Sequence, residues 1–317
     1  MNFLFLMDPL ETVKVYSDTS FIFMLGAHER GHKVFFLPSG GISLKKGLVN
    51  FKATEVIPVV REEAIPFDIV SEKILTENEA DAVFIRTDPP FDSDYLMNTW
   101  LLERAESSVA VINSPHGIRT VNEKIWATQF TDLIPRTVIS RHLSDFKEFL
   151  TEEKNIIIKP TDGFGGAGVF KISEDAPNKN VSFEMLSDRN QKEVIMQQYI
   201  PEAAIGDKRI LLLDGEPLGA VLRVHGEDDH RNNFYAGGKP VATEITERDL
   251  EVIKTLKPHL KKLGLHFVGI DMLGDYLIEV NVTSPTCLQE MNQLYDCKLQ
   301  DSVIQFAENL IKEKYKN

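Results

Sequence analysis

The stretch IIIKPTDGFGGAGVFKI (156–172) holds four glycines in six positions, and a short apolar run flanks them on each side. The runs predict two strands, and the glycines predict a hairpin with a bare backbone at its tip. No Gly-Lys-Ser/Thr follows and no helix comes next, which excludes a Walker loop and a dinucleotide fingerprint. The N–H groups of the tip can close over phosphates, toward which Lys159 would point; a plain flexible loop is the alternative.

The strongest chemical signal downstream is Asp271, followed by Glu279-Val280-Asn281. Glu279 and Asn281 are two residues apart, so on a strand their side chains share one face. Oxygen ligands of this kind suit Mg²⁺, which prefers a few carboxylates together with substrate phosphates. A solvated polar face is the alternative. The apolar neighbours of these residues disfavour it, because acidic groups among apolar side chains need a partner.

The final hairpin must bring Asp271 and Glu279 to one face if they share a metal. A two-residue turn at Gly274-Asp275 would place Asp271 opposite Ile278 and send Glu279 to the other face. A three-residue loop over 274–276 would instead place Asp271 opposite Glu279. We therefore predict the longer loop, with Gly274 or Asp275 in the left-handed position; a bulge beside it is compatible with the pattern.

Strands and helices alternate in the first part of the chain. We expect helices starting near Asp18 and Asp92, and strands at 2–7, 33–37, 81–86 and 109–112. This order predicts an open, largely parallel α/β sheet for residues 1 to about 120. Ligands bind such sheets beyond the carboxyl ends of the strands, where the polar residues Asp8, Arg86 and Asp88 lie.

The remaining elements give the C-terminal half an α+β character. Helices are expected over 248–263 and about 301–314, and strands at 194–199, 209–213, 218–224 and in a hairpin over 266–282. Three arginines, Arg209, Arg223 and Arg231, recur near these elements and, with Arg86, could clamp carboxylates and a transferring phosphoryl group. The glycine-containing, highly charged segment 224–238 is typical of a mobile lid or of an ordinary surface loop.

The composition is that of an ordinary globular protein of two or three domains, with 317 residues, 43% hydrophobic and 26% charged. A net charge of −13 disfavours nucleic acid as a partner. Two cysteines, Cys287 and Cys297, are too few for a disulfide scaffold and favour a reducing compartment. No apolar run approaches the roughly 18 residues of a membrane span, so we expect a cytoplasmic protein without membrane contact.

The motifs together resemble the ATP-grasp ligases, and most closely the bacterial glutathione synthetases. The residues that carry the resemblance are NEK (122–124), the glycine-rich hairpin, QQYIP (197–201), GDKRILLLDGEP (206–217) and FVGIDMLGDYLIEVNVTSPT (267–286). Upstream, MDPL (7–10) and IRTDPPFDSDY (85–95) resemble the N-terminal domain of that family. The lid departs from the family pattern, since Val224-His225-Gly226 follows Arg223 and its tip is unusually acidic.

The resemblance implies a fold and a set of functional residues. The implied fold is an N-terminal α/β domain (1–121), then an ATP-grasp small subdomain (122–200) and a C-terminal subdomain with metal site and lid (201–317). The implied ATP contacts are Lys124, Lys159, Gly165, Gly166, Gln198, Tyr199, Ile200 and Asp207. The implied metal ligands are Asp271, Glu279 and Asn281. The implied catalytic arginines are Arg209 and Arg231, and the implied substrate contacts are Arg86, Arg223, Asn233, Thr283, Ser284, Pro285 and Thr286.

The resemblance also implies a reaction. ATP would activate γ-glutamylcysteine as an acyl phosphate, glycine would displace phosphate, and the products would be glutathione, ADP and phosphate. Mg²⁺ would be the metal, with Mn²⁺ as an alternative, and the family is commonly a homotetramer or homodimer. Two alternatives stay open: a related peptide ligase with a different acceptor amino acid, and a nucleotide-binding sensor without turnover. The full set of metal and phosphate residues disfavours the sensor.

Overall fold

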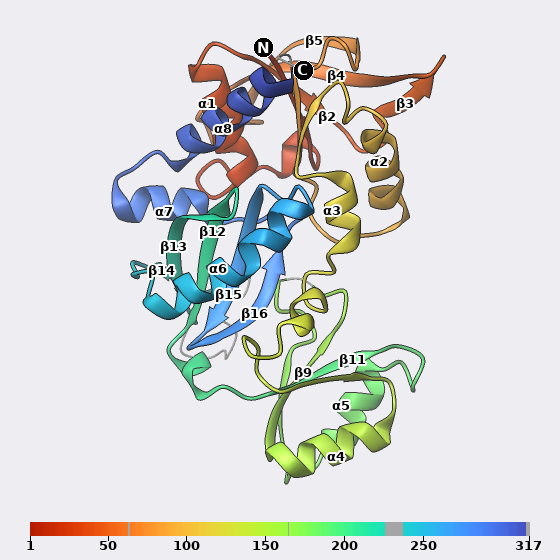
Figure 1. Cartoon of the computed structure of the whole chain (residues 1–317), viewed down its shortest axis with the longest axis vertical. Helices are drawn as coiled ribbons and strands as arrows, with labels where there is room; N and C mark the ends of the chain where they lie inside the picture. The colour runs from red at the N-terminus through yellow and green to blue at the C-terminus, as the bar shows by residue number, and fades with distance from the viewer. Residues whose placement is uncertain (63, 164, 226–236, 315–317) are drawn as a thin grey trace.

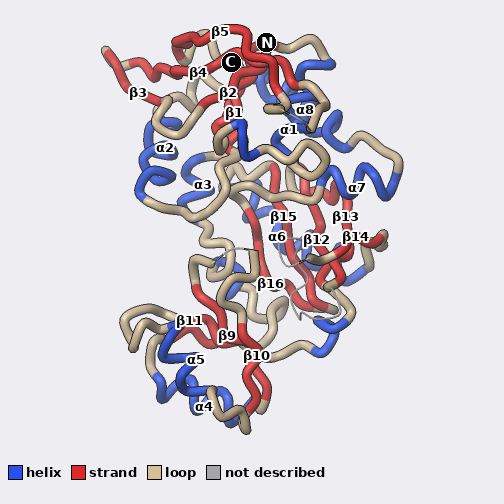
Figure 2. Tube along the Cα trace, turned by 180° about the vertical axis from the view of Figure 1, so that it is seen from behind, coloured by secondary structure: helices blue, strands red, loops and turns tan. Residues whose placement is uncertain are grey.

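The computed structural model describes residues 1–62, 64–163, 165–225 and 237–314. Three sheets follow one another along the long axis of the molecule, and the chain carries helices around each of them (Figures 1 and 2). The mixed α/β class predicted from the sequence is confirmed. None of the helices in the described part of the chain is long and apolar enough to cross a membrane.

The first sheet has seven strands in the order β3-β4-β2-β1-β6-β7, with β5 paired to β4. The strands are β1 (Asn2–Leu6), β2 (Lys33–Leu37), β3 (Ile42–Lys45), β4 (Leu48–Pro58), β5 (Phe67–Thr76), β6 (Ala82–Ile85) and β7 (Ala110–Ile112). Its helices are α1 (Thr19–Glu29), α2 (Ser93–Glu103) and α3 (Pro115–Thr120). Asp18 caps α1 by accepting a hydrogen bond from the backbone N–H of Phe21 at 2.8 Å.

Both faces of the parallel part of this sheet are buried, which explains its continuous apolar strands. Along β1, Phe3 and Phe5 pack into one core, and Leu4 and Leu6 pack into another. Figure 1 shows α1 and α8 (Leu299–Lys314) on one side of the sheet and α2 and α3 on the other. The last described helix therefore completes the layer that the first helix begins.

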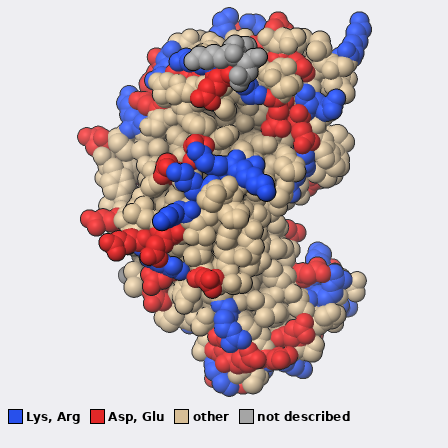
Figure 3. Space-filling view, in the orientation of Figure 1, with Lys and Arg blue, Asp and Glu red and all other residues tan. Residues whose placement is uncertain are grey.

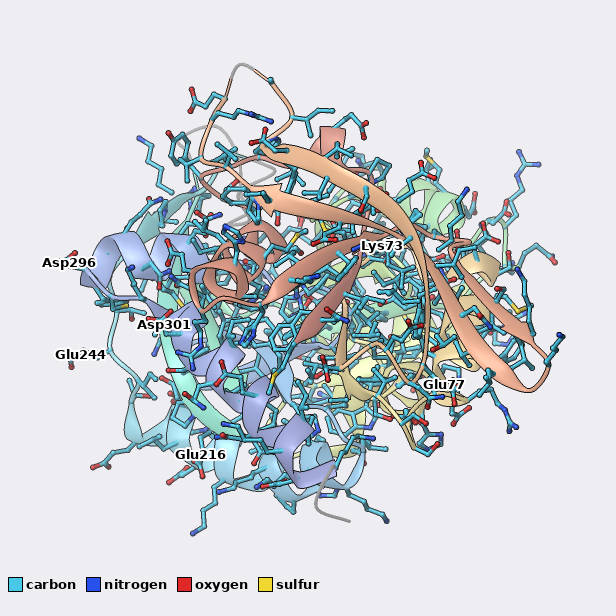
Figure 4. The ribbon with its side chains drawn as sticks, turned by 90° about the horizontal axis from the view of Figure 1, so that it is seen from above. Lys73, Glu77, Glu216, Glu244, Asp296 and Asp301 are labelled. Atoms are coloured by element: carbon cyan, nitrogen blue, oxygen red, sulfur yellow. The ribbon has the colours of Figure 1, made fainter. Side chains whose placement is uncertain are left out.

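The expectation of a largely parallel sheet is only partly right. β1, β2, β6 and β7 are parallel neighbours, but β3, β4 and β5 pair antiparallel and were not predicted. The sequence of β5 mixes charged and apolar residues without strict alternation, and half of its residues are exposed, including Ile69 and Ile74. Figure 4 shows this β4–β5 ribbon from above, with Lys73, which is paired with Glu55, on β5.

The second sheet is antiparallel and forms a lobe at one end of the molecule (Figure 1). Its order is β10-β9-β11-β8, and its strands are β8 (Thr137–Ser140), β9 (Asn155–Pro160), β10 (Phe170–Ser173) and β11 (Val194–Gln198). Helices α4 (Leu143–Glu153) and α5 (Lys179–Leu186) cover it. Phe146, Phe149 and Phe183 belong to a core that includes no residue of the other sheets.

The third sheet is antiparallel with the order β14-β13-β12-β15-β16. Its strands are β12 (Asp207–Leu213), β13 (Glu216–Val224), β14 (Lys239–Val241), β15 (Phe267–Leu273) and β16 (Tyr276–Asn281). On β12, Ile210 and Leu212 share a core with α6 (Glu247–Lys262), while Leu211 shares the other core with α7 (Leu288–Tyr295). These two cores also contain residues of the first sheet, so the first and third sheets form one body.

Short 3₁₀ helices lie where the chain passes between these parts, namely η2 (Trp126–Gln129) and η3 (Pro201–Ala204), and a third, η1 (Leu10–Thr12), lies between β1 and α1. The surface is hollowed on one side between the α4–α5 lobe and the rest of the molecule (Figure 3). Outside residues 42–76, the predicted helices and strands are confirmed, and most of their ends lie within one or two residues of the prediction. Helices α3, α4, α5 and α7 were not predicted.

Candidate active site

One large cavity of about 1340 Å³ draws its walls from all three sheets. The loops after β1 and β6 supply Asp8, Arg86 and Asp88, as expected for the carboxyl ends of parallel strands. Of the residues singled out in the sequence, these line the cavity: Arg86, Lys124, Lys159, Gly165, Gly166, Tyr199, Asp207, Arg209, Arg223, Asp271, Glu279, Asn281, Thr283, Ser284 and Thr286. Residues as far apart in the sequence as Asp8 and Thr286 are thus brought to one site.

Two lysines converge on one wall of the cavity. Lys159 on β9 is only 6% exposed, and its Nζ donates to Gln197 Oε1 at 3.2 Å. Burial lowers the pKa of Lys159 to about 8, with a smaller contribution from the neighbouring Lys124 charge. Burial alone would also lower the pKa of Lys124, but Glu279 at 2.6 Å outweighs it and raises that pKa. A polyanion could bind both lysines at once.

The glycine-rich tip borders the same wall. Gly165, Gly166 and Gly168 have φ values of 60°, 75° and 73°, which L side chains rarely adopt. Lys124 Nζ donates to the carbonyl of Gly163, and Asn122 Nδ2 donates to the carbonyl of Thr161 at 3.2 Å. The segment that begins at Asn122 therefore fastens the base of the tip, and the glycines leave its backbone free of side chains.

Of residues 198–200, which were predicted to contact ATP, only one lies at the cavity wall. Tyr199 lines the cavity, and Lys171 Nζ lies 3.7 Å from the centre of its ring. Gln198 and Ile200 do not contribute to the lining; the neighbouring Gln197 does, and it was missed. Ile157, Leu273 and Ile278 add an apolar surface there, which a flat aromatic base could contact.

The final hairpin brings the predicted metal ligands to one face. Asp271 on β15 pairs directly with Glu279 on β16, and Gly269 pairs with Asn281. The predicted three-residue loop is wrong: Leu273 pairs with Tyr276, so the turn is Gly274-Asp275, with Gly274 at φ 52°. The register shifts beyond Asp271, where Ile278 is the extra residue. This bulge restores the shared face that a two-residue turn alone would have removed.

Asp271 holds two buried arginines. Arg209 binds it through Nε and Nη2, the latter at 2.8 Å, and Arg223 Nη2 lies 3.0 Å from Asp271 Oδ2. Burial would raise the pKa of Asp271, but the two arginines outweigh it and hold the pKa far below its usual value. Arg223 also binds both carboxylate oxygens of Asp207. The four charges form one network, in which no buried charge is left uncompensated.

The donor set fits a hard divalent cation. The described residues contain no group of three His, Cys, Asp or Glu side chains placed to hold a metal, so the trio depends on the amide of Asn281 as its third oxygen donor. An ionised carboxylate has about four lone-pair positions, and the arginines leave part of this capacity of Asp271 free. Asn281 Nδ2 faces Gly269 O at 3.3 Å and Asp271 Oδ2 at 3.4 Å, which leaves its oxygen for a metal.

The segment after β16 forms the opposite wall. Glu123 Oε1 accepts from the backbone N–H groups of Val282 and Thr283 and from the Thr283 hydroxyl, at 2.8–3.0 Å. Thr283, Ser284 and Thr286 line the cavity, whereas Pro285 packs behind it against Gly269. A single carboxylate, which the sequence analysis had not singled out, thus fixes the shape of this wall.

Arg86 lies deep between the first and third sheets. It is 4% exposed, with its guanidinium 5.6 Å and 5.7 Å from the ring centres of Phe23 and Phe267. Its Nε donates to Ser20 Oγ and its Nη2 donates to Pro285 O, each at 3.0 Å. The predicted substrate contact therefore also ties the wall at 285 to the first sheet.

Some predicted residues cannot be placed, and some cavity residues were overlooked. Arg231, Asn233 and most of the predicted lid lie outside the described residues. Asp18, Glu123, Gln197 and Glu290 line the cavity without having been assigned a role from the sequence. Glu123 and Gln197 belong to the quoted motifs NEK and QQYIP, and Asp18 was expected at a helix start, whereas Glu290 had no local signal. Cys287 is buried and also lines the cavity.

Comparison with known proteins gives a consistent result. The family description "Prokaryotic glutathione synthetase, N-terminal domain" matches residues 1–119, and "Prokaryotic glutathione synthetase, ATP-grasp domain" matches residues 123–296. The glutathione synthetase of Pseudomonas aeruginosa is 38% identical over 300 residues, covering 94% of each chain. That of Mesorhizobium japonicum is 40% identical over 288 residues, covering 90% of this chain and 91% of the relative.

Solved structures share the fold at low identity. The D-cycloserine synthetase DcsG superposes with a TM-score of 0.67 at 14% identity, covering 99% of this chain and 100% of that one. The ATP-grasp ligase PsnB, solved with a minimal precursor, Mg and ADP, gives a TM-score of 0.60 at 17% identity and covers 98% of both chains. The architecture is therefore that of ATP-grasp ligases.

Proposed function

Because the chain belongs to the prokaryotic glutathione synthetase family, we propose that its central cavity joins γ-glutamylcysteine to glycine, with ATP converted to ADP and phosphate. The chain is an ATP-grasp carboxylate–amine ligase that acts in glutathione synthesis. The observation that carries the assignment of its site is the pairing of Asp271 with Glu279 on one strand face, beside Lys124 and Lys159.

ATP binds between the second and third sheets in this proposal. Lys124 and Lys159 contact its phosphates, Gly165 and Gly166 close over them, and Tyr199 borders the base. The backbone around Gln198 and Ile200 forms the hinge that reads the edge of the adenine. The support is that both lysines and the glycine-rich tip line the same wall, next to an apolar patch. Asp207 acts indirectly, because its carboxylate is held by Arg223.

Asp271, Glu279 and Asn281 hold Mg²⁺ in this proposal, or Mn²⁺ in its place. A cation held there would supply the positive charge that offsets the phosphate charge during phosphoryl transfer. The acidic pair is already compensated by Arg209 and Lys124. Lys124 can therefore turn from Glu279 to a phosphate when nucleotide and metal arrive together.

The chemistry has two steps. The cysteinyl carboxylate attacks the γ-phosphate of ATP and forms an acyl phosphate, and glycine then displaces phosphate from it. Arg209 stabilises the transferring group and the later oxyanion, and its bidentate bond to Asp271 holds it in position beforehand. Arg86, Arg223 and residues 283–286 contact the peptide, and Arg231 and Asn233 do so from the lid.

Further parts of the proposal concern the whole molecule. The domains are 1–121, 122–200 and 201–317, supported by one sheet in each range. The protein works in the cytoplasm as a homotetramer or homodimer, without nucleic-acid or membrane partners. The 224–238 segment is a lid that affects peptide or acceptor use, so Arg231→Ala should lower turnover while the affinity for ATP stays near the parent value.

ADP release is the direct test. The protein should release ADP only when Mg²⁺, ATP and γ-glutamylcysteine are present with an acceptor, and glycine should be the best acceptor in a panel of amino acids. A strong preference for another amino acid would identify a related ligase with a different acceptor. Nucleotide binding without any substrate-dependent ADP release would identify a sensor.

A further inference from the structure

Glu290 is an acidic residue of the cavity wall that none of the proposed steps uses. It lies in the first turn of α7, one helical turn after Cys287, and both residues line the cavity. Its Oε2 is buried and has no hydrogen-bond partner among the residues that the structure describes. A buried carboxylate oxygen without a donor is costly, so the position is suited to a ligand that brings N–H groups.

The other acidic groups of this wall are already engaged. Within the described residues, the carboxylates that the third sheet and the preceding segment contribute to the cavity have these partners: Glu279 with Lys124, Asp271 with Arg209, Asp207 with Arg223, and Glu123 with Thr283. Glu290 forms no ion pair there. It is therefore the acid of this wall with free capacity to accept a proton.

Glu290 also lies on the side of the cavity where acyl transfer is proposed. The charged and titratable groups within electrostatic reach of it are Arg209 on β12 and Cys287 at the start of α7. Pro285, two residues before Cys287, packs against Gly269, and Arg209 Cδ lies beside the same glycine. Gln289 anchors the same turn of α7 by donating to Val15 O at 2.9 Å.

Acyl transfer requires a proton acceptor at this place. Free glycine carries an ammonium group at neutral pH, and nitrogen cannot attack a carbonyl until it loses a proton. Lys124 and Lys159 are assigned to the ATP phosphates in the proposed function, and Asp271 is tied to arginines that hold its pKa low. Burial raises the pKa of Glu290, which moves it toward the basicity that general bases need.

We propose that Glu290 binds the ammonium group of the acceptor amino acid and takes its proton during acyl transfer, which makes Glu290 a catalytic residue. This inference rests on the proposed function. The nitrogen lone pair forms the C–N bond while the C–O bond to phosphate breaks, and phosphate leaves with that electron pair. The second nitrogen proton goes to the departing phosphate, and Glu290 later releases its proton to water.

The test compares two acceptors in Glu290→Gln. Hydroxylamine is uncharged at neutral pH and attacks acyl phosphates without a base, giving a hydroxamate. The variant should lose glycine-dependent turnover by about 10²-fold or more, the usual scale of a general base, while hydroxamate formation from γ-glutamylcysteine and ATP stays near the parent rate. Raising the pH should partly restore the glycine rate, because free amine accumulates.

Two further variants complete the test. Glu290→Asp keeps a carboxylate and should recover part of the glycine rate, whereas Glu216→Gln, at the edge of the molecule in Figure 4, should change neither rate. Equal loss with both acceptors would assign Glu290 a structural role, and an unchanged glycine rate would remove it from the reaction. If the parent protein itself made no hydroxamate and no ADP, the proposed function would fail instead.

Discussion

The two hairpins that border the cavity, β9–β10 and β15–β16, are built in opposite ways. The β9–β10 hairpin ends in a long tip with three left-handed glycines, and Phe170 on its second strand is 43% exposed. In β15–β16 the turn has two residues, and every residue of β15 up to Met272 is buried. The first hairpin can move its backbone, whereas the second holds charged side chains in fixed positions. A phosphoryl-transfer site needs both properties.

Asp271 should give the largest effect, because it is both a proposed metal ligand and the partner of buried Arg209. Asp271→Asn leaves Arg209 without its counter-charge and should lower the free energy of unfolding by about 3–5 kcal/mol. Turnover should be lost as well. Urea denaturation and ADP release measure the two effects. Adding Arg209→Gln should recover part of the stability but none of the turnover; a fully stable single variant would contradict the rigid role of this hairpin.

Glu279→Gln should separate turnover from stability. Glu279 is half-buried, and in the variant its partner Lys124 still donates to the carbonyl of Gly163. The free energy of unfolding should therefore change by only about 1 kcal/mol. Turnover should fall about 10²–10³-fold, as when one preorganised charge is removed from a reaction site. Asn281→Ala should behave alike, and Asp275→Asn in the exposed turn of the same hairpin is the control. Near-normal turnover at saturating Mg²⁺ would remove the metal assignment.

The affinity for MgATP should depend on pH through Lys159. Its pKa of about 8 in the free protein is low because of burial, and bound phosphates must raise it. Below pH 8 the lysine is already protonated. Above pH 8 binding must also take up a proton, so the affinity should fall, by at most about tenfold per pH unit. Calorimetry at pH 8.5 in buffers of different ionisation enthalpy should detect proton uptake, which Lys159→Arg should abolish.

The smallest effect is expected at the glycine-rich tip. Gly166→Ala forces an alanine to adopt a backbone φ of 75°, which should destabilise the closed tip by about 1 kcal/mol. The KM for ATP should then rise roughly fivefold. Gly47→Ala, in another turn at φ 84°, carries the same strain far from the cavity and should leave that KM unchanged. Amide exchange at 165–168 should slow when a nonhydrolysable ATP analogue binds; unchanged exchange would mean that the tip does not close.

Local patterns in the sequence predicted the two hairpins but not all of their detail. The glycines of 163–168 and the alternation at 279–281 are signals within a few residues. The bulge at Ile278 has no such signal, because it depends on packing against neighbouring strands, and the predicted loop was wrong for that reason. Strand β5 was missed because its exposed, mixed side chains resemble a polar loop. Strand β4 does carry a signal, since the buried Val49, Phe51 and Ala53 alternate with polar residues, and the sequence analysis overlooked it.

Residues that act at long range were the hardest to predict. Glu123 fixes the turn at 282–283 from more than 150 positions away, and nothing near either segment shows this contact. Glu290 looks like an ordinary acidic residue in the first turn of a helix. That Asp271, Glu279 and Asn281 lie with Lys124 and Lys159 at one site could be predicted, because each stands inside a recognisable local motif. The resemblance to a family rested on the order of those motifs along the chain, which no single motif contains.

The position of α8 has a consequence for how the protein is made. This helix packs on α1, and its Glu308 binds Arg30 and His32, which lie between α1 and β2, at 2.8 Å. Phe21 and Met24 share a core with Val303 and Ile304. A growing chain on the ribosome therefore synthesises the first sheet long before the helix that covers it. A fragment ending near residue 121 should expose that apolar surface, bind chaperones and aggregate, although it contains every strand of the first sheet.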